Sequence, residues 1–279
     1  MGTLRKYLAA LATTVAVLAL SACGVGTGAS PAATTGSIGT VTVKVGASPV
    51  PHAKILQFVK DNLAASAGID LQIVEFDDYV QPNEALASKE LDANYFQHLP
   101  YLEAQIKDKG YKFSHGAGIH IEPYAAFSKK YKSITELPDG ATIAITNDAS
   151  NQIRGLRLLA EKGLLKDITD TSSVVSLTDA QNPHKYKFIE NQSEVIVQQL
   201  DDPKIDLAFI NGNFILTAGL KAADALLVEK VAGNPYANVL VWRTDNTNPG
   251  VAKLDTLLHS KEVAEFIKKT WPSGDVIPG

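Results

Sequence analysis

The sequence from residue 41 onward alternates between short strand-like runs and longer amphipathic runs with helical spacing. VTVKVGA (41–47) and LQIVEF (71–76) have the residue types of strands, and HAKILQFVKDNLAASAG (52–68) between them carries apolar residues three or four positions apart. A strand, a helix and a second strand in this order are typical of the βαβ unit, in which the helix packs on a parallel sheet. The alternation therefore predicts an α/β fold.

The same alternation continues along the chain and restarts after Pro123. Further strands are expected at 93–96, 141–148, 186–190, 205–212 and 236–243, and helices at 81–91, 98–110, 149–163, 193–202, 213–220 and 251–271. A chain of 279 residues with 45% hydrophobic residues can bury more than one core. We therefore predict lobe 1 from residues 41–122 and 237–279 and lobe 2 from residues 123–236, with two crossovers between the lobes near residues 122 and 236.

The N-terminal segment differs in composition from the rest of the chain. Two basic residues precede the apolar run YLAALATTVAVLAL, which is shorter than the ~20 residues needed to span a bilayer, and small residues follow it. LSACG (20–24) resembles the cleavage box of bacterial lipoproteins, in which the cysteine becomes the lipid-bearing first residue. We therefore predict a signal peptide over residues 1–22, lipidation at Cys23, and a flexible lipidated tether over residues 23–40. The expected location is the extracytoplasmic face of the cell membrane, with the lipid as the anchor.

Charge and motif content argue against several classes of function. The formal net charge is −4 and no Lys- or Arg-rich run appears, which argues against a nucleic-acid partner. The sequence has no G-x-S-x-G, H-E-x-x-H, GxxxxGK[ST] or G-x-G-x-x-G motif, and its single cysteine, Cys23, is assigned to the anchor. We therefore expect neither an enzyme, such as an extracellular hydrolase, nor a cofactor.

Polar residues follow several predicted strands, where ligands bind in open α/β sheets. In NDASNQIRGL (147–156) a strand gives way to a helix, and Asn151 and Arg154 share one face of its first turns. A guanidinium fork beside the free N–H groups of a helix N-terminus can bind a carboxylate, although an arginine there is often solvated or paired. Asn211 in AFINGN follows another strand, and Asn238 lies near the second crossover. Each asparagine can instead cap a helix or lie in a turn.

Aromatic residues gather in DANYFQHLPYL (92–102), around the end of a predicted strand. Phe96, His98 and Tyr101 are close together there, and Tyr79 in FDDYVQPNEAL can contribute a further ring. One interpretation is an aromatic stripe in the core beneath a helix. The other is a slot for an apolar or thioether chain, since sulfur gains ~0.3 to 1.5 kcal/mol from each contact with an aromatic ring.

Taken together, these segments resemble the methionine-binding lipoproteins of the NlpA/MetQ family, the substrate-binding components of ABC importers. The resemblance rests on five blocks in the same order: DYVQPNEALASKELDANYFQHLPYL, YKSITELPDGATIAI, NDASNQIRGLRLL, INGNF and NPYAN. It implies a periplasmic-binding-protein-like clamp that closes on a free amino acid, with an ABC permease and its ATPase as partners. It also implies that Arg154 binds the ligand carboxylate. The other ligand contacts implied are Tyr79, Phe96, His98 and Tyr101 around the side chain, and Asn151, Asn211 and Asn238 at the polar end.

The resemblance thus predicts a lipid-anchored substrate-binding protein that takes methionine, above all L-methionine, between its two lobes. Some relatives take D-methionine or short methionyl peptides, so another small amino acid or a methionyl dipeptide is an alternative ligand. A second alternative is a metal-binding lipoprotein with His98, His115 and His120 as ligands. The five-residue spacing of His115 and His120 does not favour a shared metal, because it places the two side chains on opposite faces of a strand.

Overall fold

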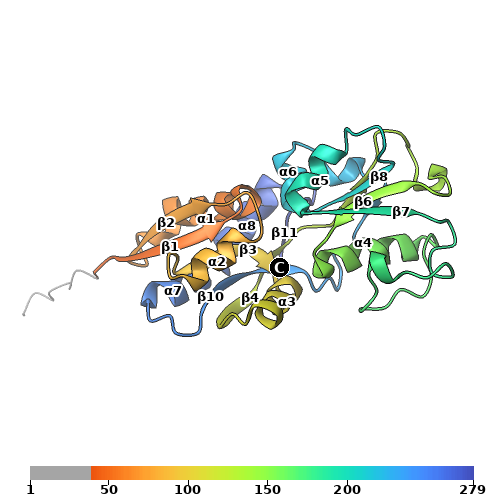
Figure 1. The fold of residues 1–279 in the computed structure, drawn as a ribbon. Coiled ribbons are helices and arrows are strands. Elements are labelled where there is room, and N and C mark those ends of the chain that lie inside the picture. The colour runs from red at the N-terminus through yellow and green to blue at the C-terminus, as the bar shows by residue number, and fades with distance from the viewer. Residues whose placement is uncertain (1–38) are drawn as a thin grey trace, which may run out of the picture. The chain divides into compact units, whose positions relative to one another are not determined.

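The computed structural model describes residues 39–279, which form one compact unit. The predicted signal peptide, Cys23 and nearly all of the predicted tether lie outside the described residues. Within residues 39–279 no helix is long and apolar enough to cross a membrane. The unit contains two separate sheets, each flanked by helices, at the left and right of Figure 1.

The first lobe is built on a six-stranded mixed sheet in the order β11-β4-β10-β3-β1-β2. Its strands are β1 (Val41–Ala47), β2 (Ile69–Glu75), β3 (Ala93–His98), β4 (Phe113–Ile121), β10 (Ala237–Arg243) and β11 (Ile277–Pro278). Its helical segments are η1 (Pro49–Ala53), α1 (Lys54–Val59), η2 (Lys60–Ala64), α2 (Gln81–Ala87), α3 (Leu99–Lys109), α7 (Pro249–Leu258) and α8 (Lys261–Thr270). Strand β1 pairs in parallel with β2 and β3, as expected of βαβ units, whereas β10 is antiparallel to β3 and β4.

The second lobe is built on a five-stranded sheet in the order β7-β6-β8-β5-β9. Its strands are β5 (Ala125–Phe127), β6 (Thr142–Thr146), β7 (Lys187–Asn191), β8 (Leu207–Ile210) and β9 (Leu227–Val228). Its helices are α4 (Ala149–Glu161), α5 (Ser193–Gln199) and α6 (Gly212–Thr217), with short helical turns η3 (Ile134–Glu136), η4 (Val174–Ser176) and η5 (Ala222–Asp224).

Both faces of the second sheet are buried, and the sequence alternates accordingly. Ile143, Ile145 and Phe209 pack into the cluster that contains the apolar face of α4. Ala144 and Ala208, one position away, pack into the cluster formed with α5 and α6. Successive side chains of a strand point to opposite faces, so one run of apolar residues supplies two cores.

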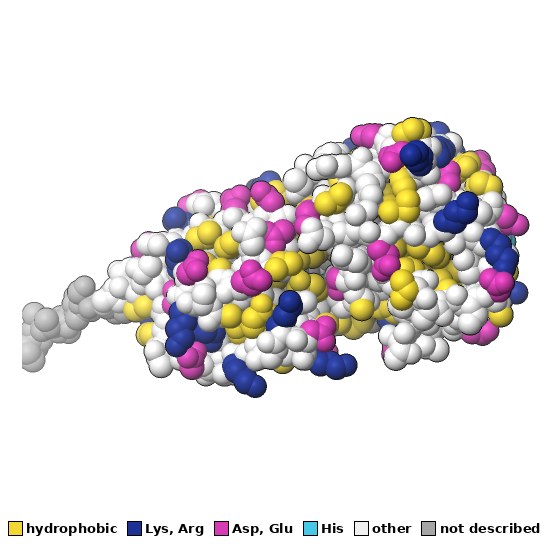
Figure 2. Space-filling model, viewed as in Figure 1, with side chains coloured by type: hydrophobic (Ala, Val, Ile, Leu, Met, Phe, Trp, Pro, Cys, Tyr) yellow, Lys and Arg dark blue, Asp and Glu magenta, His cyan; other side chains and the backbone are white. Residues whose placement is uncertain are grey.

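Two connections join the sheets. The chain leaves β4 at Ile121 and enters β5 at Ala125, and it leaves β9 at Val228 and returns to the first sheet at Ala237. The two-lobed α/β fold with two crossovers, predicted from the sequence, is therefore confirmed. Basic and acidic side chains are interspersed on the face seen in Figure 2, with no large area of one sign.

The predicted continuous helix over 251–271 is wrong. The structure has two helices there, α7 and α8, which are separated at His259 and Ser260. Ser260 has an extended backbone and its Oγ accepts a hydrogen bond from the N–H of Val263, so it caps the start of α8. The apolar spacing alone did not reveal this cap.

Strand β4 was not predicted. Its sequence, FSHGAGIHI, contains two glycines, which weaken the strand pattern. At Gly118 a Cβ atom would lie 2.6 Å from the Cβ of Ala237, and the pairing of β4 with β10 is irregular beside it. The close approach of the two strands therefore requires a glycine at this position.

Candidate functional site

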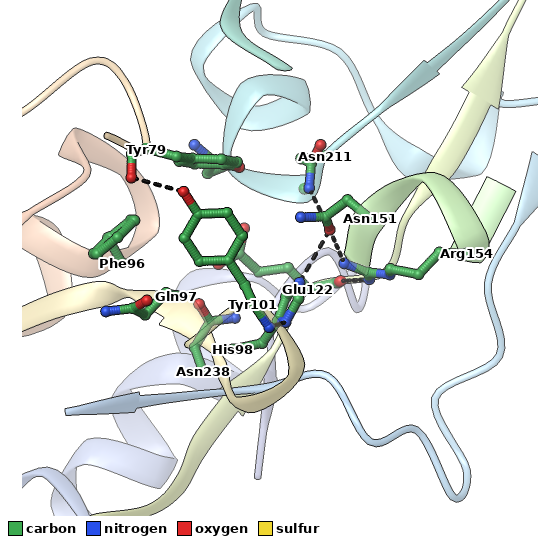
Figure 3. Close-up of a pocket in the computed structure, with 12 residues that line it drawn as sticks. Tyr79, Phe96, Gln97, His98, Tyr101, Glu122, Asn151, Arg154, Asn211 and Asn238 are labelled. Carbon is green, nitrogen blue, oxygen red and sulfur yellow. Dashed lines mark hydrogen bonds between the residues drawn. The ribbon is translucent and has the colours of Figure 1, made fainter. Parts of the chain in front are cut away.

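The eight residues predicted to contact a ligand line one cavity between the two lobes (Figure 3). The space between the lining atoms, including the open mouth, is about 340 Å³. The eight are Tyr79, Phe96, His98, Tyr101, Asn151, Arg154, Asn211 and Asn238. Four more residues line the same cavity: Gln97, Glu122, Gly212 and Asn213.

His98 lies where β3 ends and α3 begins. Its Nδ1 accepts a hydrogen bond from the backbone N–H of Tyr101, which caps the helix, and its Nε2 lies 3.0 Å from Oδ1 of Asn151 in the other lobe. Because Nδ1 is an acceptor, the neutral ring carries its proton on Nε2 and donates it to Asn151. Burial, followed by the nearby Arg154 guanidinium, lowers the pKa of His98 to about 3. The ring is therefore neutral at physiological pH.

Asn151 is the centre of the polar network. It lies in the first turn of α4, and its Nδ2 donates to the carboxylate of Asp148, the residue that caps this helix. Its Oδ1 accepts from His98 Nε2 at 3.0 Å, from Arg154 Nη1 at 2.9 Å and from Asn211 Nδ2 at 2.9 Å. A carbonyl oxygen has only two lone pairs, so three donors compete for this atom.

Arg154 is 3% exposed and is held from several sides. Its Nε and Nη2 donate to the two carboxylate oxygens of Glu229 at 3.1 and 2.6 Å, and Nη2 also donates to the backbone carbonyl of Glu122. The rings of Tyr124 and Tyr236 lie 5.0 and 4.4 Å from its guanidinium carbon, within cation–π range. A guanidinium has five N–H groups, and one N–H of Nη1 has no partner within the described residues.

Aromatic rings form the opposite part of the cavity wall. Tyr79 lies 5.9 Å from both Phe96 and Tyr101, and 5.3 Å from Phe214 of the second lobe, between ring centroids. The hydroxyl of Tyr101 donates to the backbone carbonyl of Tyr79, and the hydroxyl of Tyr79 donates to Oδ1 of Asn213 across the lobes. These two hydrogen bonds hold the rings of Tyr79 and Tyr101 in place at the cavity wall.

Hydrogen-bond acceptors and carboxyl groups lie beside the guanidinium of Arg154 and the aromatic rings. Oδ1 of Asn211 is buried and has no hydrogen-bond partner within residues 39–279. Glu122 and Glu229 contribute carboxylates close to Arg154, and Asp148, which accepts a hydrogen bond from Asn151, contributes a third carboxylate. Burial raises the pKa of Glu122 and also that of Asp148. A cationic group on a ligand would favour the ionised form of these two buried carboxyl groups.

A model of the NlpA lipoprotein family matches residues 43–279, nearly all of the described chain. The chain belongs to the NlpA lipoprotein family. A family member, the methionine-binding lipoprotein MetQ of Bacillus subtilis, is 36% identical over 264 residues, which cover 93% of each chain.

Solved structures of similar proteins agree with this family assignment. A lipoprotein from Actinomyces odontolyticus has 50% sequence identity and a TM-score of 0.81, over 86% of this chain and 99% of that one. A nutrient-binding protein from Burkholderia cenocepacia, solved bound to methionine, has 39% identity and a TM-score of 0.78, over 85% of this chain and 99% of that one.

The histidines proposed for the metal-binding alternative do not come together in this NlpA-family protein. His98 lies in the cavity and bonds to Asn151, whereas the exposed His115 donates from Nδ1 to the carbonyl of Gly116. His120 is fully buried in a different group, with His52 and Glu122. The set of His98, His115 and His120 is therefore wrong as a metal site.

Sequence reasoning missed Glu229, and it missed four of the lining residues. Glu229 lies 75 positions from Arg154 and no local pattern connects the two. Gly212 follows Asn211 directly, and a Cβ atom there would lie 2.5 Å from the Cβ of Glu122, so only glycine allows this approach. The sequence signal for Gly212 and Asn213 was only that they directly follow Asn211 in INGN.

Proposed function

We propose that this protein is the lipid-anchored substrate-binding component of an ABC importer and that it binds L-methionine in the cavity between its lobes. The supporting observation is that one cavity combines an unpaired N–H of Arg154 with a wall of aromatic rings. A carboxylate fits the first, and a thioether chain fits the second. No covalent chemistry is needed for this role.

The polar network supports a free amino acid as the ligand. Asn151 Oδ1 has more donors than lone pairs, so at least one donor can turn to a ligand carboxylate without losing a full hydrogen bond. The buried, unpaired Oδ1 of Asn211 is an acceptor for the α-ammonium group. The nearby carboxylates also favour that group.

The two ends of the cavity support a single amino acid as the ligand. Polar residues line one end and aromatic rings the other, which suits the charged groups and the side chain of one amino acid. Ligand binding would then shift the lobes towards the arrangement described here, because the cavity residues come from both lobes and contact the ligand together only when the lobes are close.

The remaining parts of the proposal concern attachment and partners. Lipidation at Cys23 would hold the folded unit at the extracytoplasmic face of the membrane through the segment up to residue 40. There it would deliver methionine to a permease driven by its ATPase, as the substrate-binding components of such importers do.

Native mass spectrometry of the protein as purified tests the ligand. We expect one methionine bound per chain, because the cavity encloses its ligand and dissociation requires the lobes to part. The bound mass should disappear after unfolding, dialysis and refolding, and return when L-methionine is added. A retained ligand of another mass, which L-methionine does not displace, would contradict the assignment.

A further inference from the structure

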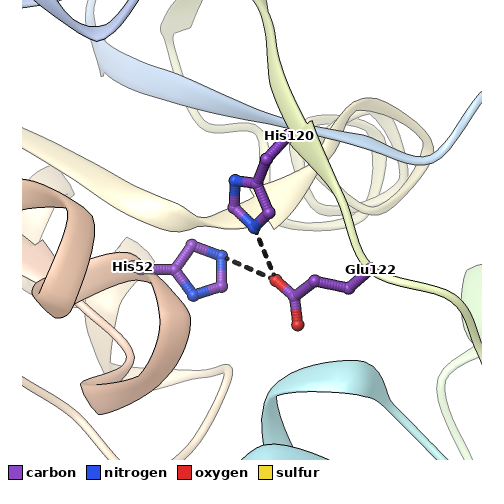
Figure 4. Close-up of side chains that lie close together, drawn as sticks. All are labelled: His52, His120 and Glu122. Carbon is purple, nitrogen blue, oxygen red and sulfur yellow. Dashed lines mark hydrogen bonds and ion pairs between the residues drawn. The ribbon is translucent and has the colours of Figure 1, made fainter. Parts of the chain in front are cut away.

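A second group of chemically active side chains lies beside the cavity, in the interior of the first lobe. His52, His120 and Glu122 come from η1, from β4 and from the first crossover, and all three are buried (Figure 4). Oε1 of Glu122 lies 2.8 Å from His120 Nε2 and 3.3 Å from His52 Nε2. One ligand atom from each of the three residues lies within 4.8 Å of the other two.

The carboxylate of Glu122 has no cation paired with it among the described residues. Arg154 donates to the backbone carbonyl of Glu122, whereas its ion pair is with Glu229. The side chains next to its Oε1 are two imidazoles, and buried carboxylates in proteins are generally paired or bound to metals.

The geometry is close to that of a zinc site. Bonds of about 2.0–2.1 Å in a tetrahedron place ligand atoms roughly 3.3 Å apart. The separation of His52 Nε2 and Glu122 Oε1 already has this value, His120 Nε2 lies 2.8 Å from the same oxygen, and the ligand atoms of the two imidazoles lie within 4.8 Å of each other. Two imidazoles and one carboxylate are also a ligand set that zinc uses in proteins.

The surroundings support metal ligation as well. The hydroxyl of Tyr95 is hydrogen-bonded to His120 Nδ1. A hydroxyl can accept a hydrogen bond as well as donate one, so it can accept from a protonated Nδ1. It can therefore hold the ring with Nε2 free for a metal, which is the usual arrangement around metal-bound histidines. Oδ1 of Asn238 lies 3.0 Å from His52 Nε2 and is a fourth potential ligand atom within reach.

We propose that His52 Nε2, His120 Nε2 and Glu122 Oε1 bind a divalent transition-metal ion, with Zn²⁺ the best fit. The ion would neutralise Glu122 and would join η1 and β4 to the first crossover. Its assignment rests on the geometry of the cluster and not on the proposed methionine function, although Glu122 also lines the cavity, and it uses histidines other than the set considered from the sequence.

Metal binding is tested on the full chain, purified in detergent with an affinity tag that contains no histidine. After treatment with a chelator and dialysis, the protein is titrated with Zn²⁺ in a calorimeter and with Co²⁺ in a spectrophotometer. We expect one ion per chain and the visible absorption of four-coordinate Co²⁺. X-ray absorption of the zinc form should show nitrogen and oxygen ligands at about 2.0–2.1 Å and no sulfur.

Variants assign the site. His52→Gln and Glu122→Gln should each weaken Zn²⁺ binding by at least about 100-fold, because each removes a ligand atom. Tyr95→Phe keeps all three ligands and should weaken binding about tenfold through the orientation of His120. The control His115→Gln changes an exposed histidine outside the cluster and should bind Zn²⁺ like the wild type.

Two results would overturn the proposal. The first is that the wild-type protein binds no stoichiometric Zn²⁺, or binds it through sulfur. This result does not depend on whether any variant folds. The other is loss of binding in His115→Gln with His52→Gln unaffected. Thermal unfolding of each variant shows whether its fold is intact.

Discussion

Arg154→Ala is expected to weaken L-methionine binding by between about 30-fold and several thousandfold. Truncating one partner of a buried, hydrogen-bonded charge pair costs about 2–5 kcal/mol of binding free energy, and 1.4 kcal/mol corresponds to a factor of ten. Arg154 is 3% exposed and its unpaired N–H is the donor proposed for the ligand carboxylate. Calorimetry on ligand-free protein measures the change.

The pairing of Arg154 with Glu229 needs its own controls. Removing Arg154 alone leaves Glu229 without its partner, which itself destabilises the fold. The double variant Arg154→Gln/Glu229→Gln removes both charges and should be more stable than Arg154→Ala while still failing to bind. Glu229→Gln alone keeps the guanidinium and should bind within about tenfold of the wild type.

Arg157→Ala provides the matched control on the same helix. Arg157 lies one turn further along α4, where it bonds to Asp170 and to the hydroxyl of Tyr236 and does not line the cavity. Its removal should leave methionine affinity nearly unchanged. Comparable affinities in Arg154→Ala and Arg157→Ala would place the carboxylate elsewhere in the molecule.

The ligand-free protein is expected to lose about 2 kcal/mol of stability between pH 7.5 and pH 5 because of His98 alone. The folded pKa of His98 is about 3, below the value of 6.5 for a free histidine. Below pH 6.5 the unfolded chain therefore binds a proton that the folded protein does not, so stability falls as the pH falls. Each pH unit below 6.5 costs about 1.4 kcal/mol until the folded pKa is reached.

His98→Asn isolates this contribution. Asparagine is a good helix cap, so it can replace the bond that Nδ1 makes to the N–H of Tyr101, but it does not titrate. Urea unfolding of both proteins without ligand gives stability as a function of pH. The wild type should lose about 2 kcal/mol more than the variant by pH 5, since Glu122 and Asp148 titrate in both. If the stability of the two proteins fell equally with falling pH, His98 would have to take up a proton in the folded state, and the prediction would be wrong.

Much of the fold and of the candidate site could be predicted because the signals are local. Asn151 and Arg154 are three residues apart at the start of one helix, so the sequence alone places them on one face. His98 and Tyr101 are in the same relation at the start of α3. The prediction that both pairs of residues line one cavity came from the family resemblance. The spacing of residues within either segment says nothing about how the two lobes face each other.

The interactions that escaped prediction join residues far apart in the sequence. Glu229 and Arg154 are 75 positions apart, and His52 and Glu122 are separated by three strands and several helices. Tyr95 shows the same limit within the aromatic segment: it is fully buried and bonds to His120 instead of lining the cavity. Its neighbour Phe96 lines the cavity, because adjacent side chains of a strand point to opposite faces.

Titration of L-methionine into protein that has been unfolded, dialysed and refolded tests the central claim most directly. The account predicts saturable heat with one ligand bound per chain, because the guanidinium of Arg154 and the rings of Tyr79, Phe96 and Tyr101 face the same cavity. Correctly refolded protein that gives no binding heat with L-methionine at any of several temperatures would contradict it.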